Sequence, residues 1–326
     1  MSAAGTHHQE SRRPSGVRSG ESFKGRALRR VLTLVNTRSG LPWSFSAFRA
    51  EMDRTWDVDG VELCYQFCRS VQDGIEKARR AVEHGVDTIL VAGGDGTVST
   101  VGRVLVGTEV LLGVIPAGSG NGFARHFGIP LSPARAARAL ASAVPVSIDV
   151  GIVNDLPFLV TCSMAWDAAV ARSFQKMPVR GILPYIFAGV QEFLGYKPQK
   201  VDIVIDGQEK LAFEDPLVLT VANLTQYGGG ARIAPQARPD DGLLELVVAL
   251  RQDIPKLVAN VGRLFNGTVD QIPEVIMRRF RTLEVARREP APIQVDGELI
   301  DAPAVVRVRV MPAALRVLAP EQHRAQ

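Results

Sequence analysis

Hydrophobic residues are spaced in two different ways along the chain, and the first spacing gives way to the second near residue 147. In the first part, short apolar runs alternate with segments whose apolar residues recur three or four positions apart, which is the spacing of one helical face. Strands are expected at residues 31–35, 61–65, 88–92 and 111–115, and helices at 45–52 and 71–82. This alternation predicts a mainly parallel sheet connected by crossover helices.

After residue 147, strand-like runs dominate and helical spacing becomes rare. The runs cover residues 148–153, 158–163, 201–205, 217–222, 243–248, 293–295 and 305–310. Asp206-Gly207 and Asp240-Asp241-Gly242 lie between such runs, and Asp-Gly pairs favour the type I′ turns of β-hairpins. The second part is therefore predicted to be antiparallel and β-rich, with helical insertions at residues 182–194 and 254–265.

The length of 326 residues exceeds what one hydrophobic core usually supports, so two domains are expected. Residues 29–147 form the predicted α/β domain and residues 148–304 the β-rich domain, while residues 305–326 add a last strand that returns to the first domain. Residues 1–28 are rich in Ser, Gly, Arg and His without an apolar stretch, which predicts a disordered tail rather than an export signal.

The charge balance narrows the classes of partner. A net charge of +4 suits anionic nucleotides or an anionic membrane surface, but it is too small to favour nucleic acid. Three cysteines are too few for a disulfide framework and are interpreted as packing thiols in a reducing compartment. No apolar window approaches the roughly 18 residues of a membrane-spanning helix. A cytoplasmic protein is expected, with peripheral contact to a membrane as the closest association.

The strongest chemical signal is the sequence GGDGT at residues 93–97, directly after an expected strand and before a helical segment. Glycine lets the backbone approach a ligand closely, and free amides at the start of a helix attract phosphate. The carboxylate of Asp95 would repel phosphate, which favours either Mg²⁺ as a bridge or a role near the transferred group. The competing interpretation is a tight turn in which Asp95 caps the helix.

A second glycine-rich loop, PAGSGNG at residues 116–122, follows the next expected strand. Its three glycines, serine hydroxyl and asparagine amide are typical of a cradle for phosphate or ribose. Two such loops after neighbouring parallel strands would face each other at the carboxyl edge of the sheet, where ligands bind in open α/β sheets. A connection without a ligand is the alternative.

Five motifs in chain order carry a resemblance to a known family: NTRSG at residues 36–40, GGDGT, PAGSGN, RPDDGL at 238–243 and DGE at 296–298. Together they resemble the diacylglycerol kinase catalytic-domain family, which includes bacterial lipid kinases, sphingosine kinases and ceramide kinases. The resemblance implies an α/β domain with a mainly parallel sheet, of the NAD kinase/diacylglycerol kinase type, followed by an antiparallel β-sandwich domain. It also implies an ATP- and Mg²⁺-dependent kinase whose acceptor is a lipid hydroxyl.

By this resemblance, the nucleotide site is lined by residues of the first three motifs. They are Asn36, Thr37, Arg38, Ser39, Gly40, Gly93, Gly94, Asp95, Gly96, Thr97, Val98, Ser99, Gly118, Ser119, Gly120 and Asn121. The sequence has no Walker-type lysine loop, so backbone amides and Mg²⁺ would hold the phosphates. Relatives often have threonine where Cys68 falls by spacing, so an ATP contact expected there would be lost.

The resemblance places the general base in the DGE motif. Taken alone, DGE between two strand-like runs is a hairpin turn with solvated carboxylates. In bacterial relatives the motif supplies the proposed base and a magnesium-site carboxylate, so Glu298 or Asp296 would accept the proton of the lipid hydroxyl, with Glu298 narrowly preferred. In sphingosine kinases the base is assigned to the aspartate of GGDGT, which is Asp95 here.

RPDDGL resembles the structural magnesium loop of the family, which maps to the carboxylate of Asp241 and the carbonyls of Arg238 and Leu243. The remaining metal-ligand candidates are Asp95 and Glu298. The motif NGFAR departs from the family pattern at Gly122, where many bacterial members have an aspartate that supports the catalytic magnesium network. The same GSGN version is found in sphingosine kinases.

The sequence leaves alternatives open for the residues that contact the lipid and for the reaction that the protein catalyses. Asp167 is a candidate head-group contact, and the apolar segment 181–194 either walls an acyl pocket or forms an ordinary core helix. A soluble-substrate kinase of the NAD-kinase type also carries GGDGT. A nucleotide-binding regulatory module without turnover is the third hypothesis, motivated by Gly122 and Cys68. The oligomeric state is also left open, with a homodimer as one alternative.

Overall fold

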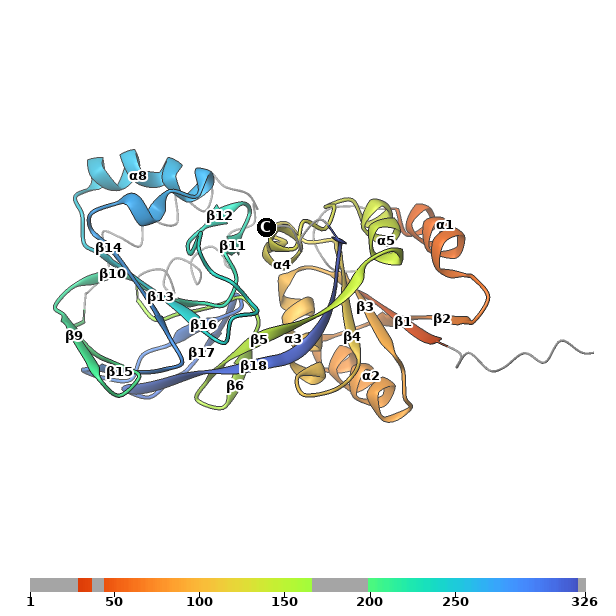
Figure 1. The fold of residues 1–326 in the computed structure, drawn as a ribbon, viewed down its shortest axis with the longest axis horizontal. Coiled ribbons are helices and arrows are strands. Elements are labelled where there is room, and N and C mark those ends of the chain that lie inside the picture. Colours follow the sequence, from red (N-terminus) through yellow and green to blue (C-terminus); the bar gives the residue numbers. More distant parts are fainter. Residues whose placement is uncertain (1–28, 37–43, 166–198, 322–326) are drawn as a thin grey trace, which may run out of the picture.

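The computed structural model describes residues 29–36, 44–165 and 199–321. Several sequence predictions lie outside these ranges: the tail 1–28, the helical insertion 182–194 and the site residues Thr37, Arg38, Ser39, Gly40 and Asp167. Within the described part, Figure 1 shows two lobes side by side, with long paired strands passing from one lobe into the other.

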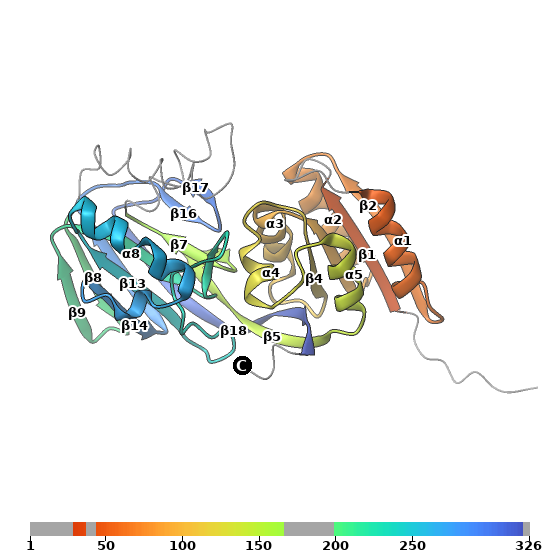
Figure 2. The same cartoon turned by 90° about the horizontal axis from the view of Figure 1, so that it is seen from above.

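The first lobe is a parallel sheet covered by helices on both faces. Its strands are β1 Arg29–Asn36, β2 Val61–Cys68, β3 Thr88–Gly93 and β4 Leu111–Pro116, in the order β2-β1-β3-β4. Its helices are α1 Phe45–Trp56, α2 Val71–Glu83, α3 Asp95–Leu105, α4 Gly122–His126 and α5 Pro133–Ala141. Helices α1 and α5 cover one face, and α2 and α3 the other (Figures 1 and 2). This double cover explains why all six residues of β3 are buried.

The second lobe is built from two sheets packed face to face. One is antiparallel with the order β14-β13-β10-β7-β16-β17, and the other continues the sheet of the first lobe through β18-β15-β8-β9, while β11 and β12 pair separately with each other. The strands are β5 Val144–Val153, β6 Leu156–Phe158, β7 Thr161–Ser163, β8 Val201–Ile205, β9 Glu209–Phe213, β10 Pro216–Ala222, β11 Gln226–Gly228, β12 Ala231–Arg232, β13 Leu244–Leu250, β14 Val275–Phe280, β15 Thr282–Arg287, β16 Ile293–Val295, β17 Glu298–Ile300 and β18 Val305–Ala319. Helix α8 Ile254–Asn266 and the short 3-10 helix Val269–Gln271 follow β13.

Two long strands join the lobes. β5 and β18 pair antiparallel along most of their length, and Figure 2 shows them running together from one lobe to the other. At its far end β18 pairs with β4 through Val317 and Leu112, and nearer its start it pairs with β15. The register shifts between Met311 and Leu315. The strand expected at residues 305–310 is therefore only the beginning of a 15-residue strand.

The single strand expected at residues 158–163 is divided in the structure between the end of β6 and β7, because the chain changes sheets inside this run. β6 pairs with β5 in the first sheet, whereas β7 pairs with β10 and β16 in the second. Leu159 and Val160 lie between the two strands, and their amides donate to the carboxylate of Asp296 instead of a strand ladder. The interruption therefore belongs to the candidate site.

The two expected Asp-Gly hairpins have different outcomes. Asp206 and Gly207 have φ values of 49° and 68° and connect the paired strands β8 and β9, as a type I′ turn requires. A type I′ hairpin at Asp240-Asp241-Gly242 is wrong, because of these three only Gly242 has a positive φ. β13, which follows this loop, pairs with β10 and β14, and the loop is held against β5 instead, through the Asp149 amide bonded to the Pro239 carbonyl.

Candidate functional site

The two glycine-rich loops lie in direct contact at the carboxyl ends of β3 and β4. The Ala117 amide donates a 2.9 Å hydrogen bond to the Gly93 carbonyl. A Cβ atom built on Gly118 would lie 2.6 Å from the Cα of Gly94, so the two backbones pass this closely only because both residues are glycine. The prediction that the loops face each other is confirmed.

Asp95 bridges these loops. Its two carboxylate oxygens accept hydrogen bonds from the amides of Asn121 and Gly122, both at 2.7 Å. A Cβ atom on Gly120 would come within 2.5 Å of the same carboxylate. Burial raises the pKa of Asp95 above its ordinary value, the amides of Gly122 and Asn121 oppose this rise, and the negative charge of Asp296 adds to it.

The start of helix α3 opens to solvent. Gly96 is exposed, and a Cβ atom built on it would meet no atom within 4 Å. Asn36, at the end of β1, donates a 2.8 Å hydrogen bond to the Thr97 hydroxyl, which brings the first motif to the second. Ser119 is exposed at the tip of the second loop, but the side chain of Val98 is buried in the core and lines no open surface.

The DGE motif forms the turn between β16 and β17. Val295 and Glu298 pair across it, and Asp296 and Gly297 have φ values of 50° and 89°. The predicted hairpin turn is therefore confirmed, since aspartate tolerates a positive φ and glycine favours it. The expectation of two solvated carboxylates is wrong for Asp296, whose side chain is 1% exposed, whereas that of Glu298 is 40% exposed.

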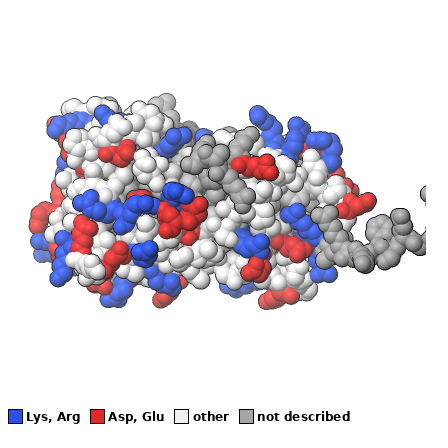
Figure 3. Space-filling model, viewed as in Figure 1, with Lys and Arg blue, Asp and Glu red and all other residues white. Residues whose placement is uncertain are grey.

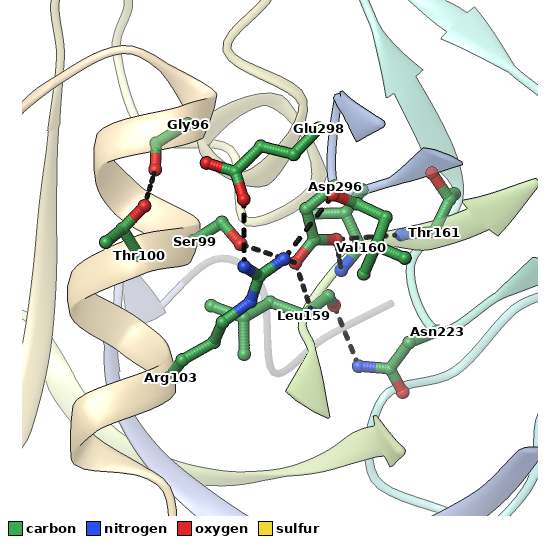
Figure 4. A network of polar contacts seen from close by, with 11 residues as sticks. Gly96, Ser99, Thr100, Arg103, Leu159, Val160, Thr161, Asn223, Asp296 and Glu298 are labelled. Carbon is green, nitrogen blue, oxygen red and sulfur yellow. Dashed lines mark hydrogen bonds and ion pairs between the residues drawn. The ribbon is translucent and has the colours of Figure 1, made fainter. Parts of the chain in front are cut away.

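Hydrogen-bond donors surround the carboxylate of Asp296 (Figure 4). One oxygen accepts from the Ser99 hydroxyl at 2.6 Å and from the Leu159 amide at 2.8 Å. The other accepts from the amides of Val160 and Thr161, at 2.8 and 3.1 Å. Ser99, predicted as a nucleotide contact, is buried here and directs its hydroxyl to Asp296.

Arg103 of α3 completes this cluster, and the sequence analysis missed it. Its guanidinium lies 3.0 Å from the Glu298 carboxylate and 3.8 Å from that of Asp296, and it donates to the Val295 carbonyl at 3.4 Å. Figure 4 shows the side chain reaching from the helix to the acidic turn. A signal was present, because Asp95, Ser99 and Arg103 are four residues apart and so share one helical face.

The carboxylate of Asp241 in the RPDDGL loop is held by donors of the protein itself. One oxygen of Asp241 accepts from the Leu243 amide at 3.0 Å, and the other forms an ion pair with Arg279. Arg279 also lies 3.1 Å from Glu245 on the neighbouring strand, so a guanidinium already neutralises this acidic pair. Arg238 pairs with Asp240. In residues 29–36, 44–165 and 199–321, no three metal-ligating side chains cluster.

A third glycine run, YGGG at residues 227–230, closes over the second loop. The Gly229 amide donates a 2.9 Å hydrogen bond to the Gly120 carbonyl. A Cβ atom on Gly122 would lie 3.2 Å from the Gly228 nitrogen, so the backbone of residues 227–230 leaves little room for a side chain at residue 122. The run of glycines was the available sequence signal for this contact.

Behind the site, Asp149 and Asn223 form a buried polar connection. Asp149 accepts hydrogen bonds from the amides of Gly242 and Ala313, at 2.7 and 2.8 Å. The amide nitrogen of the Asn223 side chain donates to the Asp149 and Leu159 carbonyls, at 2.8 and 2.9 Å. A charged residue inside the apolar run 148–153 was the sequence signal for such a buried contact.

Comparison with known proteins identifies the family. The family model described as the diacylglycerol kinase catalytic domain matches residues 30–153, and that of the YegS C-terminal NAD kinase beta sandwich-like domain matches residues 160–319. A diacylglycerol kinase from Mycobacterium tuberculosis is 33% identical over 298 residues, which cover 89% of this chain and 95% of that protein. The chain belongs to the diacylglycerol kinase catalytic-domain family. Membership in this kinase family makes it a phosphotransferase.

Other members support this placement. A Pseudomonas aeruginosa protein named "Probable lipid kinase YegS-like" is 34% identical over 253 residues, covering 74% of this chain and 81% of that protein. A solved structure of a diacylglycerol kinase from Bacillus anthracis has a TM-score of 0.68 at 18% identity, covering 92% of this chain and 99% of that one. At this identity the likeness concerns the fold, and the predicted architecture of an α/β domain followed by a β-sandwich domain is confirmed.

Proposed function

We propose that the protein is a kinase that transfers the γ-phosphoryl group of Mg-ATP to the hydroxyl of a lipid, with diacylglycerol as the first acceptor. The observation that carries the proposal is the contact of two glycine-rich loops around Asp95, in the same molecule as a turn that presents Glu298. Phosphoryl transfer requires positioning and charge neutralisation from a protein more than covalent chemistry. The names of the family relatives favour a lipid acceptor.

The reaction exchanges one phosphorus–oxygen bond for another. The lipid hydroxyl oxygen bonds to the γ-phosphorus while the bond to the bridging oxygen of ADP breaks, and ADP leaves with that electron pair. The hydroxyl proton passes to the carboxylate of Glu298. Glu298 suits this role better than Asp296, because it is 40% exposed whereas Asp296 is 1% exposed and saturated by donors. A carboxylate of ordinary basicity can serve when the proton moves late in the transfer.

Backbone amides and Asp95 are the groups that this chain offers to the nucleotide. The open start of α3 at Gly96 and the exposed tip of the second loop at Ser119 are the proposed phosphate contacts. Magnesium in kinase sites is bound by one or two carboxylates together with substrate phosphates. Asp95 fits this pattern, because each of its oxygens accepts one amide and keeps a further lone pair. A bound Mg²⁺ ion would neutralise negative charge on the phosphates.

The lipid would be taken from a membrane or micelle surface. Among the residues with described positions, the structure contains no helix whose length and apolar character would let it cross a bilayer. Basic and acidic side chains are intermixed on the face shown in Figure 3. The described part of this face therefore shows no basic patch of one sign that would attract anionic lipids.

A phosphorylation assay tests the proposal. Purified protein with Mg-ATP and diacylglycerol in mixed micelles should form phosphatidic acid, identified by mass spectrometry, and monoacylglycerol and sphingoid bases should be tested in parallel. The Glu298→Gln variant should lose about 100-fold or more in kcat. Glu284→Gln is the matched control, because Glu284 is 44% exposed and pairs with Arg307 at 2.9 Å, much as Glu298 pairs with Arg103.

Two other outcomes would contradict a lipid kinase. Phosphorylation of NAD in detergent-free buffer, without labelling of any lipid, would favour the NAD-kinase type of substrate. Thermal stabilisation by Mg-ATP without transfer to any acceptor would favour a regulatory module. Full turnover in the Glu298→Gln variant would move the general base to Asp95.

A further inference from the structure

We infer that Asp296 is a positioning residue that fastens the acidic turn of the second lobe to helix α3 of the first, and thereby places Glu298. The inference rests on the proposed function in taking Glu298 as the group that meets the lipid hydroxyl. It assigns Asp296 and Ser99 a role that neither catalysis nor nucleotide binding requires of them.

The contacts of the Asp296 carboxylate are those of an acceptor. It accepts four hydrogen bonds, one from a hydroxyl and three from amides, at 2.6 to 3.1 Å. The Asp296 carboxylate is 1% exposed, and these four donors occupy its lone pairs. A general base needs instead to come within hydrogen-bond distance of the substrate proton. Asp296 cannot reach a lipid hydroxyl without leaving these donors unpaired.

The hydrogen-bond donors to the Asp296 carboxylate come from two separate parts of the fold. Ser99 lies on α3, four residues after Asp95, whereas Leu159, Val160 and Thr161 belong to the segment where the chain changes sheets. One carboxylate therefore joins the helix of the first glycine-rich loop to the interruption between β6 and β7. Breaking such a buried network leaves several donors without partners, which costs more than the net value of one hydrogen bond.

The turn between β16 and β17 directs the side chain of Asp296 inward. Asp296 has a φ of 50°, and its side chain points inward, away from the solvent that an Asp-Gly turn usually faces. Glu298 follows two residues later as the first residue of β17, so the position of Asp296 determines where β17 begins. Arg103, on the same helix as Ser99, then holds the Glu298 carboxylate at 3.0 Å. Helix α3 thus contacts both ends of the DGE motif (Figure 4).

Two variants test this role. Asp296→Asn keeps the shape and the tolerance for a positive φ, but it turns one acceptor into a donor that faces amide donors. Ser99→Ala removes only the hydroxyl that comes from α3 and should fold even where Asp296→Asn does not. The matched control is Asp206→Asn, since Asp206 occupies the same type of turn with a φ of 49° and accepts the amides of Arg281 and Thr282.

Kinetics distinguish positioning from proton transfer. Asp296→Asn should lower kcat by about 100-fold with the KM for ATP nearly unchanged, because a misplaced reacting group costs rate rather than nucleotide binding. Ser99→Ala should lower kcat in the same direction by a smaller factor, and Asp206→Asn should not change it. Wild-type kcat in both Asp296→Asn and Ser99→Ala, or a raised KM for ATP at unchanged kcat in both, would overturn the inference.

Hydrogen exchange gives a measurement that does not depend on activity. The amides of residues 159–161 should exchange faster in Asp296→Asn than in the wild type, and those of Arg281 and Thr282 should do so in Asp206→Asn. If the wild type phosphorylates no lipid while this exchange pattern holds, the proposed function fails and the contact stands. If exchange at residues 159–161 is unchanged, Asp296 does not hold this segment and the inference fails.

Discussion

Arg103 and Glu298 form an ion pair between helix α3 and the acidic turn. The two groups are 3.0 Å apart, with Arg103 15% exposed and Glu298 40% exposed. A charge-assisted hydrogen bond of this kind fixes the orientation of the carboxylate more than it contributes to stability, because the pair is partly solvated. Arg103 is therefore expected to act on catalysis through the position of Glu298.

The Arg103→Gln variant tests this expectation. We expect kcat to fall by about 10-fold while the KM for ATP stays within about twofold, because Glu298 loses the partner that limits its rotamers. Arg316→Gln is the control, since Arg316 pairs with Glu109 on the surface at 2.7 Å and should behave as wild type. Steady-state kinetics with varied ATP and varied lipid measure both constants. A raised KM for ATP with unchanged kcat would assign Arg103 to the nucleotide instead.

The partly buried carboxylate of Asp95 predicts how stability depends on pH. Burial raises its pKa in the folded protein, so the stability linked to this group is greatest below its unfolded pKa and is lost as the pH rises through its folded pKa. The free energy of unfolding of the wild type, relative to Asp95→Asn, should therefore fall as the pH rises from about 4 towards neutrality. Urea unfolding at a series of pH values measures this difference. A difference that grows with pH would mean that the amides of Asn121 and Gly122 outweigh burial.

The motifs predicted which loops meet better than they predicted the contacts of individual side chains. The pair Asp296-Gly297 predicted a turn, because the preference of aspartate and glycine for a positive φ depends only on the local sequence. The burial of Asp296 could not be predicted, since its donors lie 135 to 197 positions away in the sequence. The role of Ser99 changed for the same reason, because its partner belongs to the other lobe.

Among the elements, helix α3 is the one on which the site depends. It begins at Asp95 directly after the buried strand β3, and successive residues of one face contact the second loop, Asp296 and Glu298. The strands and helices around it were predictable, because apolar spacing and glycine positions are local signals. The interruption at Leu159 and Val160 was not, because the apolar run continues through it and a distant carboxylate takes its amides.

Gly122 provides a prediction about the contact between loops. We expect Gly122→Ala to lower the free energy of unfolding by about 1 kcal/mol, because its Cβ would lie 3.2 Å from the Gly228 nitrogen and 3.3 Å from the Gln226 carbonyl oxygen. Gly74→Ala is the control, since Gly74 lies inside α2 and its Cβ would make ordinary contact with Cys68 at 3.6 Å. That change should stabilise the protein by about 0.5–1 kcal/mol. Equal stabilisation by both substitutions in urea unfolding would contradict the packing described for residues 227–230.

For the whole molecule, the paired strands β5 and β18 make the two lobes one structure. Asp149 lies where these strands meet the RPDDGL loop, and it is 2% exposed. Its carboxylate accepts the amides of Gly242, in that loop, and Ala313, in the irregular part of β18. The last strand, which the sequence analysis expected to return to the first domain, reaches it through the pairing of β18 with β4 and β5.

Asp149→Ala should therefore destabilise the whole molecule. We expect a loss of about 3 kcal/mol in the free energy of unfolding, because two buried amides lose their acceptor. The exposed strand residue Asp202 supplies the control, and Asp202→Ala should have little effect. Urea unfolding followed by both tryptophan fluorescence and circular dichroism should show one transition, and two separated transitions would mean that the lobes unfold independently.

We propose that the loops at residues 93–97 and 116–122 hold one triphosphate between them, and a crystal structure of the protein with Mg²⁺ and a non-hydrolysable ATP analogue tests this. The phosphates should contact the backbone at Gly96 and Ser119, with the γ-phosphate between Asp95 and Glu298. A nucleotide bound away from these two loops would contradict the proposal.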